Sequence, residues 1–174
     1  MAAPDIQGRC ACGEVRFELT DRPFAIHGCH CSFCQRETGS AFAINALIES
    51  DRVRVLEGSP AAHVTASASG RGQTILRCPR CSVALWSNYP GFGEHVNFVR
   101  VGTLEARQDF APQVHIFTST RMEWLDLPAH SPRYEGMYPV SDLRVLFGGT
   151  DGQRWLACAR IATLDDCVGL RPGS

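Results

Sequence analysis

Short apolar segments alternate with turn residues along this chain, and the pattern predicts a mainly β fold. Residues 14–19 place Val15, Phe17 and Leu19 on one face of a strand. Similar alternating or β-branched segments predict strands at residues 42–48, 53–56, 63–68, 73–77, 83–86, 96–101 and 113–117. The two glycines in residues 69–72 predict a hairpin loop, and the front of the chain holds one expected helix, residues 32–38, ended by Gly39.

The length and composition suit one domain with a short extension. The chain has 174 residues and is 44% hydrophobic, which is enough for one sizeable core. We expect this domain to occupy residues 1–147. Residues 148–174 form a C-terminal extension and no separate domain, because a glycine-rich break at 148–152 precedes a short apolar element at 155–161. The extension is expected to pack on the domain or on the second subunit of a homodimer.

The charge distribution argues against nucleic acid and membranes as partners. The formal net charge is −1, and there is no strongly basic arm. No apolar stretch approaches the roughly 18 residues of a membrane span, and the first residues lack the pattern of a signal peptide. The cysteine spacings resemble metal sites and not a secreted disulfide framework, so we expect a cytoplasmic protein.

Two cysteine pairs predict a closed structural zinc site. Cys10 and Cys12 can point to one side of an extended segment, and Cys78 and Cys81 flank the tight turn of a zinc knuckle. About 65 residues separate the pairs, so a shared ion would join distant parts of the sheet and contribute directly to the free energy of folding. Buried cysteines without a metal are the less favoured reading, because four thiols in two chelating pairs seldom arise by chance.

A cysteine triplet predicts a second metal site of a different kind. Cys29, Cys31 and Cys34 supply three thiolates, which leaves one of the four zinc positions for water, a side chain or an incoming ligand. A thiol bound at that position loses its proton and becomes a positioned nucleophile. The alternative is a second structural zinc, completed by His27, His30 or His115.

At these residues the sequence resembles the glutathione-dependent formaldehyde-activating enzyme family, which also includes centromere protein V. The matching segments are residues 8–17 (GRCACGEVRF), 29–36 (CHCSFCQR), 38–42 (TGSAF), 77–81 (RCPRC) and 115–117 (HIF), followed by Trp124. They cover about residues 8–135 in the family's order. The resemblance implies an Mss4-like fold, in which zinc holds together a β-sheet of short antiparallel strands with few short helices.

The resemblance also implies roles for individual residues. Cys10, Cys12, Cys78 and Cys81 correspond to the structural zinc ligands. Cys29, Cys31 and Cys34 correspond to the catalytic, labile zinc site that accepts the thiol of glutathione. The implied partners are a small-molecule thiol and an aldehyde. The implied reaction is carbon–sulfur lyase chemistry, the joining of glutathione to formaldehyde to give S-hydroxymethylglutathione. Arg36 is the nearest candidate to bind the carboxylates of glutathione, although a solvated helix charge is its plainer interpretation.

Two other functions remain open from the sequence. One is a non-catalytic, zinc-stabilised binding module in which both metal sites are structural. The other is a redox enzyme like the peptide methionine-R-sulfoxide reductases, which needs a metal-free nucleophilic cysteine. Cys158 and Cys167 are the only thiols left for that role, and we expect one to be buried and the other exposed without function.

Overall fold

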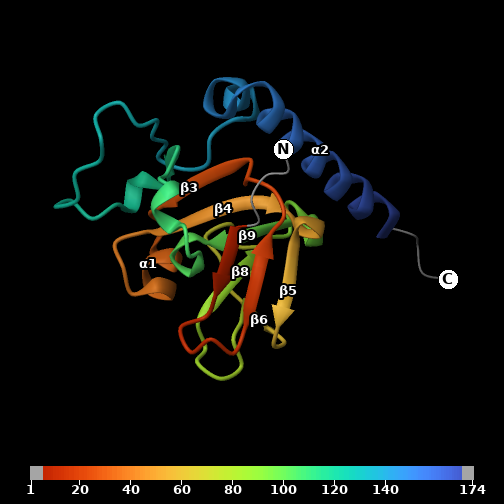
Figure 1. Ribbon diagram of the computed structural model, residues 1–174. Helices are drawn as coiled ribbons and strands as arrows, with labels where there is room; N and C mark the ends of the chain where they lie inside the picture. Colours follow the sequence, from red (N-terminus) through yellow and green to blue (C-terminus); the bar gives the residue numbers. More distant parts are fainter. Residues whose placement is uncertain (1–5, 170–174) are drawn as a thin grey trace.

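The computed structural model describes residues 6–169, with side chains described as far as residue 160. Figure 1 shows a β-sheet body with a long helix laid across one side. The strands are β1 (Ile6–Arg9), β2 (Arg16–Leu19), β3 (Ala25–Cys29), β4 (Ala43–Glu49), β5 (Val53–Glu57), β6 (Ala61–Thr65), β7 (Gln73–Arg77), β8 (Ala84–Asn88), β9 (Val96–Arg100) and β10 (Val114–Ile116). The helices are α1 (Ser32–Thr38) and α2 (Leu143–Gly169), and short 3-10 turns connect several strands.

The strands form two sheets. A larger sheet has the order β10-β3-β4-β9-β8-β7-β6, and a smaller one has the order β1-β2-β5. All neighbouring strands are antiparallel except β10 and β3, which run parallel. The hairpin predicted at residues 69–72 is present between β6 and β7.

The larger sheet separates two hydrophobic cores because its central strands are buried on both faces. On β4, Ala43 and Leu47 join the core beneath α2, whereas Ala46 and Ile48 join the core between the sheets. Phe17 of β2 packs edge-on against Trp86 of β8, with ring centroids 5.4 Å apart. The cysteine triplet lies in the core beneath α2, and Cys10 and Cys78 lie in the core between the sheets.

The expected mainly β fold is confirmed, with differences at three elements. Helix α1 and strand β7 have the predicted bounds, but β1 and β3 have no predicted counterpart. Helix α2 is much longer than the element expected at residues 155–161, and it contrasts with the expectation of short helices only. It continues past the glycine-rich segment with one interruption at Gly148, where φ is 71°. No helix in the described residues is long and apolar enough to cross a membrane.

Helix α2 packs on the body of the domain through apolar side chains. Leu143, Phe147, Trp155 and Cys158 are buried in the core that also holds the cysteine triplet. Trp155 contacts the ring of Phe92 edge-on at a centroid distance of 5.1 Å. The packing of α2 on the domain body is one of the two arrangements expected for the extension.

An ion pair fastens α2 to the sheet. Arg154 donates to both carboxylate oxygens of Glu49, from Nε at 2.7 Å and from an Nη at 2.6 Å, and its guanidinium lies over the ring of Phe24. Burial alone would raise the pKa of Glu49, but the hydrogen bonds from Arg154, a backbone hydrogen bond and the positive charges of Arg154 and Arg52 together outweigh burial and lower that pKa. The pair therefore adds fully to the free energy of unfolding when the pH is above the pKa of a glutamate in the unfolded chain. This stabilisation is lost as the pH falls through the lowered pKa of Glu49 in the folded protein.

Replacing Arg154 by methionine is expected to lower the free energy of unfolding by about 1.5–3 kcal/mol, the range for hydrogen bonds to charged groups. The difference from wild type should be the same at pH 6 and pH 8, because Glu49 is ionised throughout that range. Urea unfolding of the zinc-loaded protein measures it. Arg144→Met is the matched control, since Arg144 is exposed on the same helix. Equal stability of the two variants would show that the pair does not hold α2.

Candidate active site and metal centres

The four outer cysteines converge on one point between the two sheets. Their sulfur atoms all lie within 4.8 Å of one another. The Sγ atoms of Cys10 and Cys12 are 3.5 Å apart, and those of Cys12 and Cys78 are 3.8 Å apart. Four sulfurs at about 2.3 Å from a tetrahedral zinc are separated by about 3.8 Å, so this set of donors fits zinc.

Two similar turns present these cysteines. The backbone N–H of Cys10 donates to Val15 O, and that of Cys78 donates to Val83 O, each at 3.0 Å. In the first turn the Val15 N–H also donates to the sulfur of Cys10 at 3.3 Å. Cys10 and Cys12 therefore lie on a turn between β1 and β2 and not on the extended segment that the sequence suggested. Because the second turn joins β7 to β8, a shared ion would link the two sheets.

The triplet is assembled by the junction of β3 and α1. Cys29 is the last residue of β3, Cys31 is the N-cap of α1, and Cys34 lies one turn into the helix. The sulfur of Cys31 accepts a hydrogen bond from the Cys34 N–H at 3.3 Å, as an N-cap side chain does. All three side chains are buried, and their sulfurs lie within 4.8 Å of one another.

The three neighbouring thiols shift the pKa values of one another in opposite directions. Hydrogen bonds from Cys29 and Cys34 lower the pKa of Cys31 to about 2. The hydrogen bond to Cys31 raises the pKa of Cys29 far above its ordinary value, and the one to Cys34 and burial add to this. One thiolate thus suppresses ionisation of its neighbour, and a dication among the sulfurs is what allows all three to ionise. The donor set fits a soft divalent ion such as zinc.

The ring nitrogens of the nearby histidines make polar contacts with groups other than the three cysteines. His27 Nε2 lies 2.8 Å from the hydroxyl of Tyr138, and burial lowers the pKa of His27 to about 3, so its ring is neutral. His30 Nε2 lies 2.9 Å from His115 Nδ1. Within residues 6–160, no histidine nitrogen joins the three sulfurs in a cluster of potential ligand atoms. The geometry therefore favours a three-ligand site over the closed alternative.

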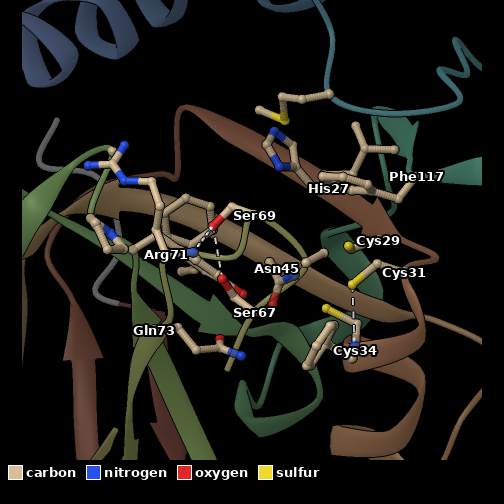
Figure 2. Close-up of a pocket in the computed structure, with 18 of the residues that line it drawn as sticks. His27, Cys29, Cys31, Cys34, Asn45, Ser67, Ser69, Arg71, Gln73 and Phe117 are labelled. Carbon is tan, nitrogen blue, oxygen red and sulfur yellow. Dashed lines mark hydrogen bonds between the residues drawn. The ribbon is translucent and has the colours of Figure 1, made fainter. Parts of the chain in front are cut away.

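The triplet opens into a cavity of about 270 Å³. Phe98, Ile116 and Phe117 belong to its largely apolar wall, and Phe33 and Met137 are half-exposed at its edge. Figure 2 shows the three cysteines on one side of this cavity and a polar group, Ser67, Ser69, Arg71 and Gln73, on the other side. The cavity thus pairs a sulfur-rich centre with a polar wall, as sites for small polar ligands commonly do.

The sequence did not single out this polar wall. Arg71 and Ser69 lie in the β6–β7 hairpin loop, and Gln73 is the first residue of β7. Ser67 donates to Gly72 O at 3.0 Å and is 2.9 Å from the Ser69 hydroxyl, so the loop is internally braced. Arg36, the nearest candidate in the sequence to bind the carboxylates of glutathione, is exposed on α1 and is not among the residues that line the cavity. Its role stays a prediction.

Comparison with known proteins decides the family. The family model described as glutathione-dependent formaldehyde-activating enzyme matches residues 5–120 of this chain. The chain belongs to this family. The matched segment contains both cysteine clusters and the polar wall of the cavity, whereas helix α2 lies beyond it.

Similar proteins are known from two bacteria. A Halomonas elongata protein named "Putative glutathione-dependent formaldehyde-activating enzyme" is 27% identical over 127 residues, which cover 70% of this chain and 80% of that protein. A Rhodobacter sphaeroides protein of known crystal structure is 25% identical in sequence to this chain. The two structures match with a TM-score of 0.45, and the match covers 57% of this chain and 88% of that one.

The remaining described thiol is poorly suited to redox chemistry. Cys158 lies on α2 with its side chain buried in the core, and burial, followed by the nearby charge of Glu49, raises its pKa to about 11. A thiol that stays protonated at neutral pH is a weak nucleophile. Cys167 lies outside the described side chains. The reductase alternative therefore has no support at Cys158.

Proposed function

We propose that this protein is a zinc-dependent carbon–sulfur lyase that joins a small-molecule thiol, glutathione as in the family's name, to formaldehyde or a related aldehyde. The observation that carries the proposal is a buried set of three thiols that opens into a cavity and lacks a fourth ligand among the described residues. In the reaction the thiol sulfur bonds to the carbonyl carbon, the π electrons of the C=O bond move to oxygen, and the thiol proton is transferred to that oxygen.

In this proposal Cys29, Cys31 and Cys34 hold a labile zinc, and Cys10, Cys12, Cys78 and Cys81 hold a structural one. A zinc bound by the triplet would supply thiol activation, since a coordinated thiol is deprotonated at neutral pH. The chain's own apolar walls exclude water around the reacting atoms, which strengthens the electrostatic interactions there. We expect the protein to work in a reducing compartment such as the cytoplasm, where these cysteines stay reduced.

Arg71 is proposed to bind a carboxylate of glutathione. The guanidinium of Arg71 forms no ion pair with any residue that the structure describes. Arg71 is among the residues that line the cavity, on the side opposite the cysteines (Figure 2). An arginine fits a carboxylate with two parallel hydrogen bonds. The half-exposed rim leaves room for the polar ends of a tripeptide thiol to reach this loop.

Arg71→Gln is expected to raise the KM for glutathione about tenfold, the equivalent of one charge-assisted hydrogen bond, with little change in kcat. Steady-state rates at varied glutathione measure this. Arg36→Gln is the comparison variant, because both arginines were candidates for the same carboxylate. The variant with the larger rise in KM identifies the arginine that binds the carboxylate. We expect this to be Arg71, because Arg71 lines the cavity and Arg36 does not. A KM unchanged in Arg71→Gln would remove Arg71 from the site.

The proposed reaction is tested by exchange NMR. Formaldehyde and glutathione combine spontaneously, so the measured quantity is the rate of exchange between free glutathione and S-hydroxymethylglutathione with and without zinc-loaded protein. Acceleration that is proportional to protein concentration supports the proposal. An unchanged exchange rate, with both zinc ions present, would favour the non-catalytic binding module.

A further inference from the structure

The core beside the triplet contains a buried arginine without an acidic partner. Arg100 ends β9 and is only 6% exposed. The buried residues of the described chain include no aspartate or glutamate, and Arg100 forms no ion pair there. A guanidinium is charged at every pH a folded protein meets, and a buried charge is costly unless another charge compensates for it.

Arg100 is held firmly in place by neutral groups. It donates to Asn45 Oδ1 from one Nη and to Ser87 Oγ from the other at 3.0 Å. Its Nε is buried without a hydrogen-bond partner in the described part of the chain. Neutral partners fix the position of the guanidinium but leave its charge uncompensated.

The pairing of strands places this charge next to the wall of the cavity that also holds the cysteine triplet. Asn45 of β4 pairs with His27 of β3 on one side and with Arg100 of β9 on the other. His27 and Asn45 both line the cavity, and Phe98, two residues before Arg100 on the same face of β9, also lines it. In Figure 2 Asn45 lies between the cysteines and the polar wall. Burial raises the pKa of Tyr89, another residue that lines the cavity, and the positive charge of Arg100 opposes that rise.

The charge of the triplet complements that of Arg100. Three thiolates and a divalent ion carry a net charge of −1, and a thiolate as fourth ligand makes it −2, whereas a neutral ligand leaves it at −1. The added negative charge is costly in a buried site unless a fixed positive charge lies nearby.

We propose that Arg100 is the counter-charge of the cysteine triplet and that it selects a thiolate over a neutral molecule as the fourth ligand. This inference rests on the proposed function only in assuming that the triplet binds a metal with an open position. Arg100 is a positioning and specificity residue and does not touch the substrate.

The test compares ligands of different charge on the cobalt-loaded protein, in which both sites hold Co²⁺. We would titrate 2-mercaptoethanol, whose only charge on binding is its sulfur, and imidazole, which is neutral, and follow the visible absorption of cobalt. Arg100→Met removes the charge and keeps the bulk, and Arg100→Lys keeps the charge. We expect Arg100→Met to raise the apparent Kd of 2-mercaptoethanol at least tenfold and that of imidazole less than twofold. Arg100→Lys should recover most of the thiol affinity.

Three outcomes would overturn the assignment: equal weakening of both ligands, no weakening of either, or failure of Arg100→Lys to recover thiol binding. Equal weakening would show that Arg100 acts only through its hydrogen bonds. If Arg100→Met does not fold, Arg100→Gln, which can still donate to Asn45, gives the same comparison. A wild-type protein that binds imidazole but no thiol would overturn the proposed function itself, which separates that failure from the failure of Arg100.

Discussion

Replacing Cys31 by serine is expected to abolish the catalysed reaction and leave the fold intact. The zinc content should fall from two ions per chain to one, and activity should fall by more than about 100-fold, since even the loss of a residue that merely supports a metal ligand commonly costs 10–100-fold. The fold should survive because Cys31 is the N-cap of α1, and serine is among the best N-cap residues. Zinc analysis, activity and thermal unfolding of the same preparation measure these effects.

Cys158→Ala is the control for this variant, because it removes a buried thiol from the same core without touching either cysteine cluster. It should retain two zinc ions and near-normal activity. A Cys31→Ser protein that keeps two zinc ions, or that keeps its activity with one, would show that the triplet is not the catalytic metal site.

Replacing Cys81 by serine is expected to destabilise the whole protein. Cys81 is half-buried, so the side-chain change itself alters packing little. The loss arises because the closed site joins the β1–β2 and β7–β8 turns, and the binding free energy of a structural zinc contributes to folding. We expect stability to fall by about 3–5 kcal/mol, by analogy with the loss of a disulfide that joins distant parts of a chain, which lowers the Tm by roughly 10–15 °C in a chain of this length.

Thermal unfolding of zinc-loaded wild type and Cys81→Ser measures this difference, with Cys158→Ala again as the thiol control. The activity of Cys81→Ser should decline with loss of the folded protein and not with loss of the triplet metal. A Cys81→Ser variant as stable as wild type would contradict the structural role of the four-cysteine site.

The sequence predicted correctly those elements whose ends are set by neighbouring residues. Helix α1 has a capping residue before it and Gly39 in the left-handed conformation after it, and its predicted bounds are confirmed. Strand β3 was missed because all five of its residues are buried, so it shows no alternation of apolar and polar positions. The glycines of α2 correctly indicated a break, which lies at Gly148, but the length of the helix was underestimated because burial of Phe147 before the break and Trp155 after it favours helix on both sides.

The candidate metal sites could also be recognised from the sequence, because their ligands lie close together along the chain. Cysteines two to three residues apart can bind one ion in many backbone conformations, so the sequence could group Cys10 and Cys12 although it suggested an extended segment where the structure has a turn. Arg71 and Arg100 were missed because their meaning depends on strand pairing across the sheet. Arg100 did carry one signal, an arginine at a position that alternates with Val96 and Phe98 in an apolar strand.

The central claim is that the triplet forms an open metal site that accepts a thiol. The most direct test is the zinc content per chain of wild type and Cys31→Ser after passage over a weak chelator, with and without glutathione. The account predicts two zinc ions in wild type when glutathione is present, loss of one ion without it, and one ion in Cys31→Ser under both conditions. Two tightly held ions in wild type that are indifferent to glutathione would contradict it and favour two closed structural sites.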